Sequence, residues 1–269
     1  MPSVLFMQNC FVPDENQFNR LKNSLESLIE WSNTTTTSND YMFVLGGYIK
    51  KEFQDEIRKL LDEVDNTISI KQSYGYFFEK NVGKGVATNK TVSEFSPGYD
   101  HLFLFDNDIC FIPDSGDIPQ ILLEQQAEMN KISPMKYPII SCNFKEHQVH
   151  GLDVLDFGCK TTHGLIKCST GNFGCIGGGC WLVDKDHWDK LGGYRTQAVY
   201  GLDDGAFYVD TINTKHRMVA LSFDVYVIHP ADSDEVYNRF KADTNVNRVR
   251  KMNYKELGDD SDSFWKTRM

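Results

Sequence analysis

Apolar and polar residues follow two different rhythms in the first part of the chain. Short continuous apolar runs, at 4–6, 41–45 and 68–70, predict buried strands. Between them, apolar residues recur at helical spacing over 18–29 and 53–64, which predicts amphipathic helices. Strands that alternate with helices in this way are typical of doubly wound α/β folds, in which ligands bind beyond the carboxyl ends of the strands.

The second part of the chain is less regular. Its pattern predicts strands at 137–142, 181–183 and 219–228 and helices at 118–129, 186–191 and 203–210, followed by a helix and a tail over 236–269. The length of 269 residues suffices for one large domain or two small ones. We expect a single α/β domain over 1–269, with its two halves at 1–112 and 113–235.

The most informative stretch is YDHLFLFDNDICFIP at 99–113, where an apolar run ends abruptly in Asp106, Asn107 and Asp108. This pattern predicts a buried strand that delivers two carboxylates to its end. Two acids one residue apart repel each other, so a cation at the strand end has to offset that repulsion. A Mg²⁺ or Mn²⁺ ion would do so, since hard metals prefer oxygen ligands. A solvated turn after a core strand is the alternative.

The charge balance opposes binding to polyanions. The chain has 28 Lys and Arg residues against 38 Asp and Glu, a net charge of −10, which disfavours long-range attraction to nucleic acid or to anionic membranes. A basic stretch at 239–255 is the exception, and a solvated helix face is the alternative reading of it. Its basic residues are Arg239, Lys241, Arg248, Arg250, Lys251 and Lys255.

The cysteines and the apolar runs bear on the compartment. Seven cysteines, an odd number without a Cys-x-x-Cys pair, fit reduced thiols better than a disulfide framework. The spacings of the later cysteines match no usual zinc finger or ribbon. The chain begins without the pattern of a secretory signal, and no apolar run approaches the length of a bilayer span. We therefore expect a soluble, cytoplasmic protein.

Four blocks in the chain carry a family resemblance. The first has the pattern N-x-G-x-G-x-A-x-N at 81–89, and the second is the acidic stretch at 106–108. The third is the glycine run at 177–179, followed by HWDKLGGY at 187–194, and the fourth is YGLDD at 200–204. In this order, these blocks resemble family-2-like glycosyltransferases of the GT-A fold. The resemblance covers 79–229, and four ordered blocks are more specific than any one of them.

The resemblance implies a fold and a donor site. It implies a GT-A-type fold: a doubly wound, mainly parallel sheet flanked by helices, with an extension on the acceptor side. The half at 1–112 would bind a nucleoside diphosphate sugar, and the half at 113–235 a hydroxyl acceptor. Asp106 and Asp108 would hold the donor and a Mn²⁺ or Mg²⁺ ion, which absorbs charge on the departing diphosphate. His229 resembles a further metal ligand, and a histidine packed at a strand end is the alternative. The other implied donor contacts are Asn81, Lys84, Asn89 and Asn107.

The resemblance also implies a catalytic base. Asp203 and Asp204 stand where the family has Glu-Asp, at the start of a helix under the acceptor site. We expect Asp204 to take the proton of the acceptor hydroxyl, with inversion at the anomeric carbon, and Asp203 to orient or bind the acceptor. An N-terminal helix cap is the structural alternative for either acid. The implied acceptor contacts are Trp181, which would stack on a sugar or base, and Gly178 and Gly179.

Departures from the family leave the substrates open. The acids that usually hold the nucleobase are missing at the first two strand ends, so neither nucleotide nor sugar is specified. A modified base in DNA, as in phage-type enzymes acting in the host cytoplasm, is one hypothesis for the acceptor, and a polysaccharide and a protein are the others. A sugar nucleotidyltransferase is an alternative, but it should carry a glycine-rich turn after the first strand, and 8–14 contains no glycine. An inactive module that binds nucleotide sugars is the non-catalytic alternative.

Overall fold

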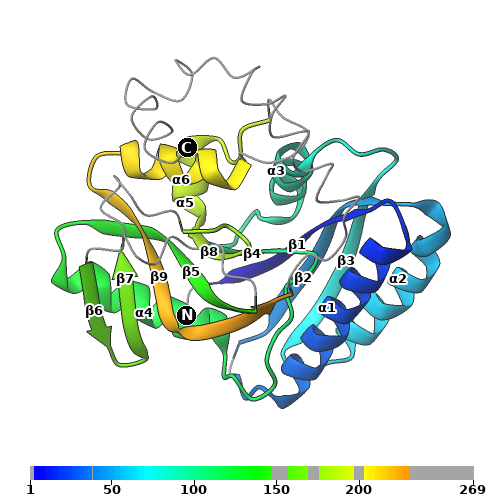
Figure 1. Ribbon diagram of the computed structural model, residues 1–269, viewed down its shortest axis with the longest axis horizontal. Helices are drawn as coiled ribbons and strands as arrows, with labels where there is room; N and C mark the ends of the chain where they lie inside the picture. Colours follow the sequence, from blue (N-terminus) through cyan, green and yellow to red (C-terminus); the bar gives the residue numbers. More distant parts are fainter. Residues whose placement is uncertain (1–2, 38, 147–156, 169–175, 197–202, 231–269) are drawn as a thin grey trace.

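A computed structural model of the protein describes residues 3–37, 39–146, 157–168, 176–196 and 203–230. These residues build one nine-stranded sheet in the order β3-β2-β1-β4-β8-β5-β9-β7-β6 (Figure 1). The predicted C-terminal helix and tail at 236–269 and the basic stretch at 239–255 lie outside the described residues. Within the described ranges, no helix combines the length and apolarity needed to cross a membrane.

The first half of the sheet is parallel. The chain builds β1, β2 and β3 outward in one direction, then returns to the other side of β1 to form β4. The carboxyl ends of β1 and β4 therefore lie next to each other where the order reverses, which is where open α/β sheets bind ligands. The elements are β1 (Val4–Val12), α1 (Glu15–Thr34), β2 (Tyr41–Ile49), α2 (Lys51–Asp65), β3 (Ile70–Phe78), α3 (Lys84–Phe95) and β4 (His101–Asp106).

The second half of the sheet is mixed, so the prediction of a mainly parallel sheet holds only as far as β4. Strand β8 runs antiparallel to both β4 and β5, β9 is parallel to β5, and β7 is antiparallel to β9 and β6. Antiparallel neighbours need no crossover helix, so strands and helices no longer alternate regularly along the chain here. The elements are α4 (Ile118–Ile132), β5 (Lys136–Glu146), β6 (Phe157–Thr161), β7 (Gly164–Cys168), β8 (Cys180–Asp184), α5 (Lys185–Leu191), α6 (Asp203–Asn213) and β9 (Arg217–His229).

Helices cover both faces of the sheet. Figure 1 shows α1, α2 and α4 on one side and α3, α5 and α6 on the other. Along β1, Val4 and Phe6 belong to the core under α1, whereas Leu5 and Met7 belong to the core under α3. Burial on both faces explains why the central strands are continuous apolar runs instead of alternating ones.

Candidate active site

The two predicted acids lie at the middle of the sheet edge. Strand β4 ends at Asp106, which pairs in register with Asn9 on the neighbouring strand β1. On the other side, the Asp106 backbone N–H donates to the carbonyl of Gly179, just before β8, at 3.0 Å. The turn that contains Asn107 and Asp108 therefore emerges between the two halves of the sheet, at the end of the strand that the sequence pattern predicted.

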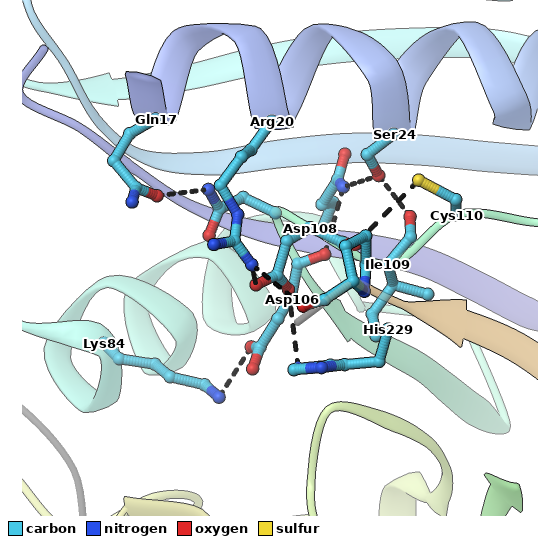
Figure 2. A network of polar contacts seen from close by, with 12 residues as sticks. Gln17, Arg20, Ser24, Lys84, Asp106, Asp108, Ile109, Cys110 and His229 are labelled. Atoms are coloured by element: carbon cyan, nitrogen blue, oxygen red, sulfur yellow. Dashed lines mark hydrogen bonds and ion pairs between the residues drawn. The ribbon is translucent and has the colours of Figure 1, made fainter. Parts of the chain in front are cut away.

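Each acid of this pair has its own cation from the protein. Lys84 Nζ lies 2.6 Å from Asp106 Oδ1, and Arg20 Nη2 lies 2.6 Å from Asp108 Oδ2 (Figure 2). His229 Nε2 lies 3.8 Å from the other oxygen of Asp108. Burial raises the pKa of Asp106, and the charge of Lys84 opposes that rise. Repulsion between the two acids is thus offset by side chains, so repulsion alone does not require a metal ion.

Arg20 belongs to a polar stripe on α1 that sequence reasoning missed. Gln17, Arg20, Ser24 and Ser27 recur at helical spacing beside the apolar face of α1. A polar stripe along the edge of an apolar helix face was the available signal, because such positions need partners when the helix packs. From sequence alone, however, a single arginine in a helix is predicted to be exposed to solvent.

The stripe holds the segment that follows β4. Ser24 Oγ donates to the carbonyl of Ile109 and accepts from Gln8 Nε2 at 2.7 Å (Figure 2). The same Gln8 amide donates to the carbonyl of Asp106 at 3.1 Å. Further along, the backbone N–H of Phe111 donates to Ser27 Oγ at 3.0 Å. Helix α1 and strand β1 together fix the backbone that carries both acids. Asn107 is placed by Gln17, whose Oε1 accepts from Asn107 Nδ2 at 3.4 Å.

Lys84 is delivered by the glycine turn before α3. Gly83 caps the helix with φ = 85°, in the left-handed region that favours glycine. Burial by itself would lower the pKa of Lys84, but the charges of Asp106, Asp203 and Asp204 outweigh it and raise the pKa well above its usual value. Lys84 is therefore a cation at neutral pH, facing both acidic segments.

The two asparagines of the 81–89 block shape the backbone in this structure. Asn81 Oδ1 accepts the N–H of Gly83 at 2.9 Å and so forms the turn into α3. Asn89 Nδ2 donates to the carbonyl of Tyr194 at 2.7 Å, and its Oδ1 accepts the N–H of Tyr194 at 2.9 Å. This reciprocal pair ties α3 to the segment after α5. Contacts of Asn81 and Asn89 with a donor stay a prediction.

One acid from each pair, Asp106 and Asp204, lines the same cavity. Helix α6 begins at Asp203, and Asp204 Oδ1 accepts the N–H of Gly205 at 2.7 Å. Gly178 lies so close that a Cβ added to it would be 2.4 Å from the Cβ of Asp204. Asp106 and Asp204 thereby share a cavity of about 220 Å³. It is lined by Asp106, Ile176, Gly177, Gly178, Gly179, Asp204, Gly205 and His229.

The two acids at the start of α6 differ in access. Asp203 is only 5% exposed, and its Oδ2 has no hydrogen-bond partner among the described residues. Burial raises the pKa of Asp203 to about 6, with the charges of Asp204 and Asp106 adding to the rise and Lys84 opposing it. Asp204 lines the cavity, whereas Asp203 does not. Of the two, Asp204 is the acid that a ligand in the cavity can reach.

The expectation for Trp181 needs correction. Its side chain is fully buried, its Nε1–H donates to the carbonyl of Gly177 at 2.6 Å, and its ring packs against Phe207. A ring without an exposed face cannot stack on a sugar or base, so Trp181 supports the glycine run from below. No alternation of apolar and polar residues separates the two roles, because every residue from 180 to 183 of β8 is buried. Gly178 and Gly179 do line the cavity, and Trp188 lies in the core.

The predicted metal ligands fit an ion that is held jointly with a ligand. Among the described residues, no group of three or more His, Cys, Asp or Glu side chains could hold an ion alone. Asp108 Oδ1 receives no hydrogen bond within that part of the chain, and it faces His229 Nε2 at 3.8 Å. Because Mg²⁺ binds its ligands at about 2.1 Å, two ligands of one ion lie within about 4.2 Å of each other. A carboxylate and an imidazole at 3.8 Å satisfy that limit and leave positions for phosphate oxygens.

Comparisons with known proteins show the fold. No family model and no curated protein matches the chain. Among solved structures, it resembles the mannosyltransferase PcManGT from Pyrobaculum calidifontis, solved with GDP-Man and Mn²⁺, with a TM-score of 0.58 and 12% identity over 94% of this chain. It also resembles GalNAc-T7, solved with UDP, GalNAc and Mn²⁺, with a TM-score of 0.56 and 12% identity over 86% of this chain. The fold is of the GT-A type. The chain spans 65% of the first neighbour and 44% of the second, so the likeness concerns the fold alone.

Proposed function

We propose that this protein is a metal-dependent glycosyltransferase, which moves a sugar from a nucleoside diphosphate sugar to a hydroxyl acceptor with inversion. One observation carries the proposal: Asp106, at the end of β4, and Asp204, at the start of α6, face the same glycine-lined cavity. The reaction needs a donor site and a base within reach of one anomeric carbon. The GT-A-type fold supports the proposal, because both neighbours were solved with a nucleotide or nucleotide sugar and Mn²⁺.

The donor would lie along the sheet edge at Asp106. In this proposal Asp108 and His229 hold Mn²⁺ or Mg²⁺ together with the diphosphate, and Asp106 and Asn107 lie near the ribose. When bound, the ion supplies positive charge that stabilises the departing diphosphate without proton transfer. Lys84, charged at neutral pH and 19% exposed at its side chain, is suited to contact the same phosphates.

Asp204 would act as the general base. A hydroxyl of the acceptor is a weak nucleophile, and a positioned carboxylate that takes its proton accelerates attack by roughly 10²–10⁴. As the acceptor oxygen bonds to the anomeric carbon, its proton passes to Asp204 and the bond from that carbon to the diphosphate oxygen breaks. Attack from the face opposite the diphosphate inverts the anomeric centre.

Donor binding tests the proposal directly. We expect UDP or GDP, or a sugar nucleotide of one of them, to raise the melting temperature only when Mn²⁺ is present. A ligand that binds the native state at a hundred times its Kd stabilises it by about 2.7 kcal/mol. Asp108→Asn should abolish this shift, because it weakens the metal ligand, while Asp189→Asn should leave it intact. Asp189 is a matched control, since it pairs with Lys185 on the exposed side of α5.

The proposal would be overturned if no nucleotide shifted the melting temperature at any Mn²⁺ concentration. It would also be overturned if Asp108→Asn and wild type responded alike to the same nucleotide and metal.

A further inference from the structure

The two oxygens of Asp108 lie in different surroundings. Oδ2 forms an ion pair with Arg20 Nη2 at 2.6 Å, whereas Oδ1 accepts no hydrogen bond from the described residues and faces His229 (Figure 2). The Arg20 guanidinium also donates to the carbonyl of Pro230 at 3.4 Å, directly after His229. One cation from α1 therefore contacts both segments that carry the proposed metal ligands.

We propose that Arg20 makes metal binding depend on the nucleoside diphosphate. This inference rests on the proposed function, and it concerns how that site fills. Without a nucleotide, the charge of Asp108 is already balanced by Arg20. A divalent ion at Oδ1 then meets one neutralised carboxylate, one imidazole and a guanidinium that repels it. The side chains of Arg20 and Asp108 are 14% and 17% exposed, so water screens this repulsion only in part.

The diphosphate reverses this balance. Its negative charges attract both the divalent ion and the guanidinium, which binds phosphate oxygens readily. The repulsion between Arg20 and the ion is then offset by their common partner. Metal and nucleotide must each increase the affinity for the other by the same factor, because binding linkage is reciprocal. Arg20 would thus lower the affinity of the site for a metal ion when no donor is bound.

A purely positioning role for Arg20 predicts the opposite change in metal affinity when Arg20 is removed. If Arg20 only oriented Asp108, its loss would let the carboxylate rotate, and the metal would bind more weakly. If its charge matters more, its loss removes a repulsive cation, and the metal binds more tightly in the absence of nucleotide. An aspartate has few side-chain rotamers to lose, whereas a full positive charge close to a divalent ion is a strong opposing interaction. We therefore expect tighter binding.

Four proteins separate charge from structure. Arg20→Gln removes the charge and keeps an N–H donor, and Arg20→Lys keeps the charge. Lys22→Gln is the matched control, because Lys22 lies on the same helix and pairs with Glu56 in an exposed position. Wild type completes the set. The readout is the Mn²⁺ dissociation constant from the electron paramagnetic resonance signal of free Mn²⁺, without nucleotide and with saturating GDP or UDP.

We expect wild type, Lys22→Gln and Arg20→Lys to bind Mn²⁺ weakly in the absence of nucleotide. With saturating nucleotide, each of the three should bind Mn²⁺ at least about tenfold more tightly than without it. Arg20→Gln should bind Mn²⁺ alone about tenfold more tightly than wild type, and the gain from the nucleotide should shrink correspondingly. In metal-free protein, Arg20→Gln should melt below wild type, because Asp108 loses its cation. Mn²⁺ added without nucleotide should raise the melting temperature of Arg20→Gln by more than it raises that of wild type.

Equal or weaker binding of Mn²⁺ to nucleotide-free Arg20→Gln would overturn this inference. The proposed function would survive that result as long as the nucleotide still enhanced Mn²⁺ binding to wild type. If no nucleotide enhanced Mn²⁺ binding to wild type, the proposed function would fail as well. Arg20→Met is the second neutral variant if Arg20→Gln does not fold, and the same comparison applies to it.

Discussion

At the scale of single residues, the base assignment gives a separable prediction. Asp204 lines the cavity with Asp106, while Asp203 is buried beside it. Asp204→Asn removes the proton acceptor without removing a proposed donor or metal ligand. Transfer should therefore fall by roughly 10²–10⁴, while Mn²⁺-dependent binding of the nucleotide stays within error of wild type. Single-turnover rates together with thermal shifts measure the two quantities. Full-speed transfer by Asp204→Asn would refute the assignment.

Gly178 offers a second test of the same contact. A Cβ on Gly178 would lie 2.4 Å from the Cβ of Asp204, so Gly178→Ala must push Asp204 or the glycine run aside. A small misplacement of a catalytic group can lower the rate about 10²-fold. We expect kcat to fall by that order, with little change in nucleotide affinity. Gly158→Ala is the control, because its Cβ would make only an ordinary contact with Leu165 at 3.5 Å. Equal kcat values for the two variants would contradict the proposed position of Asp204.

The residues of the site were predictable where local pattern decides. Asp106 and Asp108 end an apolar strand, so position and residue type coincide in the sequence, whereas Lys84 was suggested only by the family resemblance. Arg20 was missed, because its partner lies on a distant segment and no local pattern links the two. Trp181 was misassigned, because a tryptophan beside a glycine run looks the same whether it faces a ligand or the core.

At the scale of elements, the polar stripe on α1 should stabilise the fold. Ser24 is fully buried, accepts from Gln8 at 2.7 Å and donates to the carbonyl of Ile109. Ser24→Ala leaves both partners buried without that bond, which should lower the free energy of unfolding by about 1–3 kcal/mol. The adjacent Asn23 is exposed, so Asn23→Ala should change the free energy of unfolding by less than about 0.5 kcal/mol. Urea unfolding measures both, and similar losses in the two variants would argue against the stripe.

The packing of α5 on α6 should depend on pH through His187. The ring is 5% exposed, and its Nε2 lies 3.0 Å from Thr211 Oγ1. Burial lowers the pKa of His187 from 6.5 to about 4, while Asp184 opposes the change. Between those values the unfolded chain binds more protons than the native protein, so the free energy of unfolding decreases as pH falls through this window, by up to about 1.4 kcal/mol per unit.

His187→Gln tests this contribution by urea unfolding across the same pH window. The variant should be less stable than wild type above pH 6.5, and the difference should narrow as pH falls toward 4. The narrowing follows from the sign of the shift, because only wild type has to keep a neutral histidine. A constant difference between the two proteins at all pH values would show that His187 does not titrate as its burial implies.

Elements with strong periodicity were predicted, and those at the sheet edges were not. Helices α1, α2 and α4 appeared as apolar stripes, and β1, β2 and β4 as apolar runs, because both faces of the central sheet are buried. Strand β3 was predicted only at 68–70 but extends over Ile70–Phe78, since an edge strand in which only Ile70 is buried lacks a continuous apolar run. The β6–β7 hairpin at the opposite edge was missed for a related reason: it is short, and its pattern is not strictly alternating.

At the scale of the whole molecule, the α/β class followed from the alternation of strands and helices, but the mixed half of the sheet did not. Strand β8 inserts between β4 and β5, although it comes later in the chain than both. This insertion brings Gly178 and Gly179 next to Asp106, and α6 then places Asp204 over them. The cavity therefore depends on long-range pairing that no local pattern in the sequence encodes.

The net charge of the chain bears on the kind of acceptor. A chain with a net charge of −10 repels polyanions at long range, so we expect a glycan hydroxyl rather than a modified base in DNA. At saturating donor, the acceptor KM should then change little between low and physiological salt, because an uncharged sugar releases no counterions. An acceptor held by six or more phosphate contacts would instead lose affinity by about 10³-fold or more over the same range. Steady-state transfer to neutral oligosaccharides and to hydroxymethylated DNA, each measured across a salt series, decides between them. The assignment would be reversed if DNA were the better acceptor and its affinity fell steeply with salt. That outcome would leave the proposed donor site and the role of Asp204 unchanged.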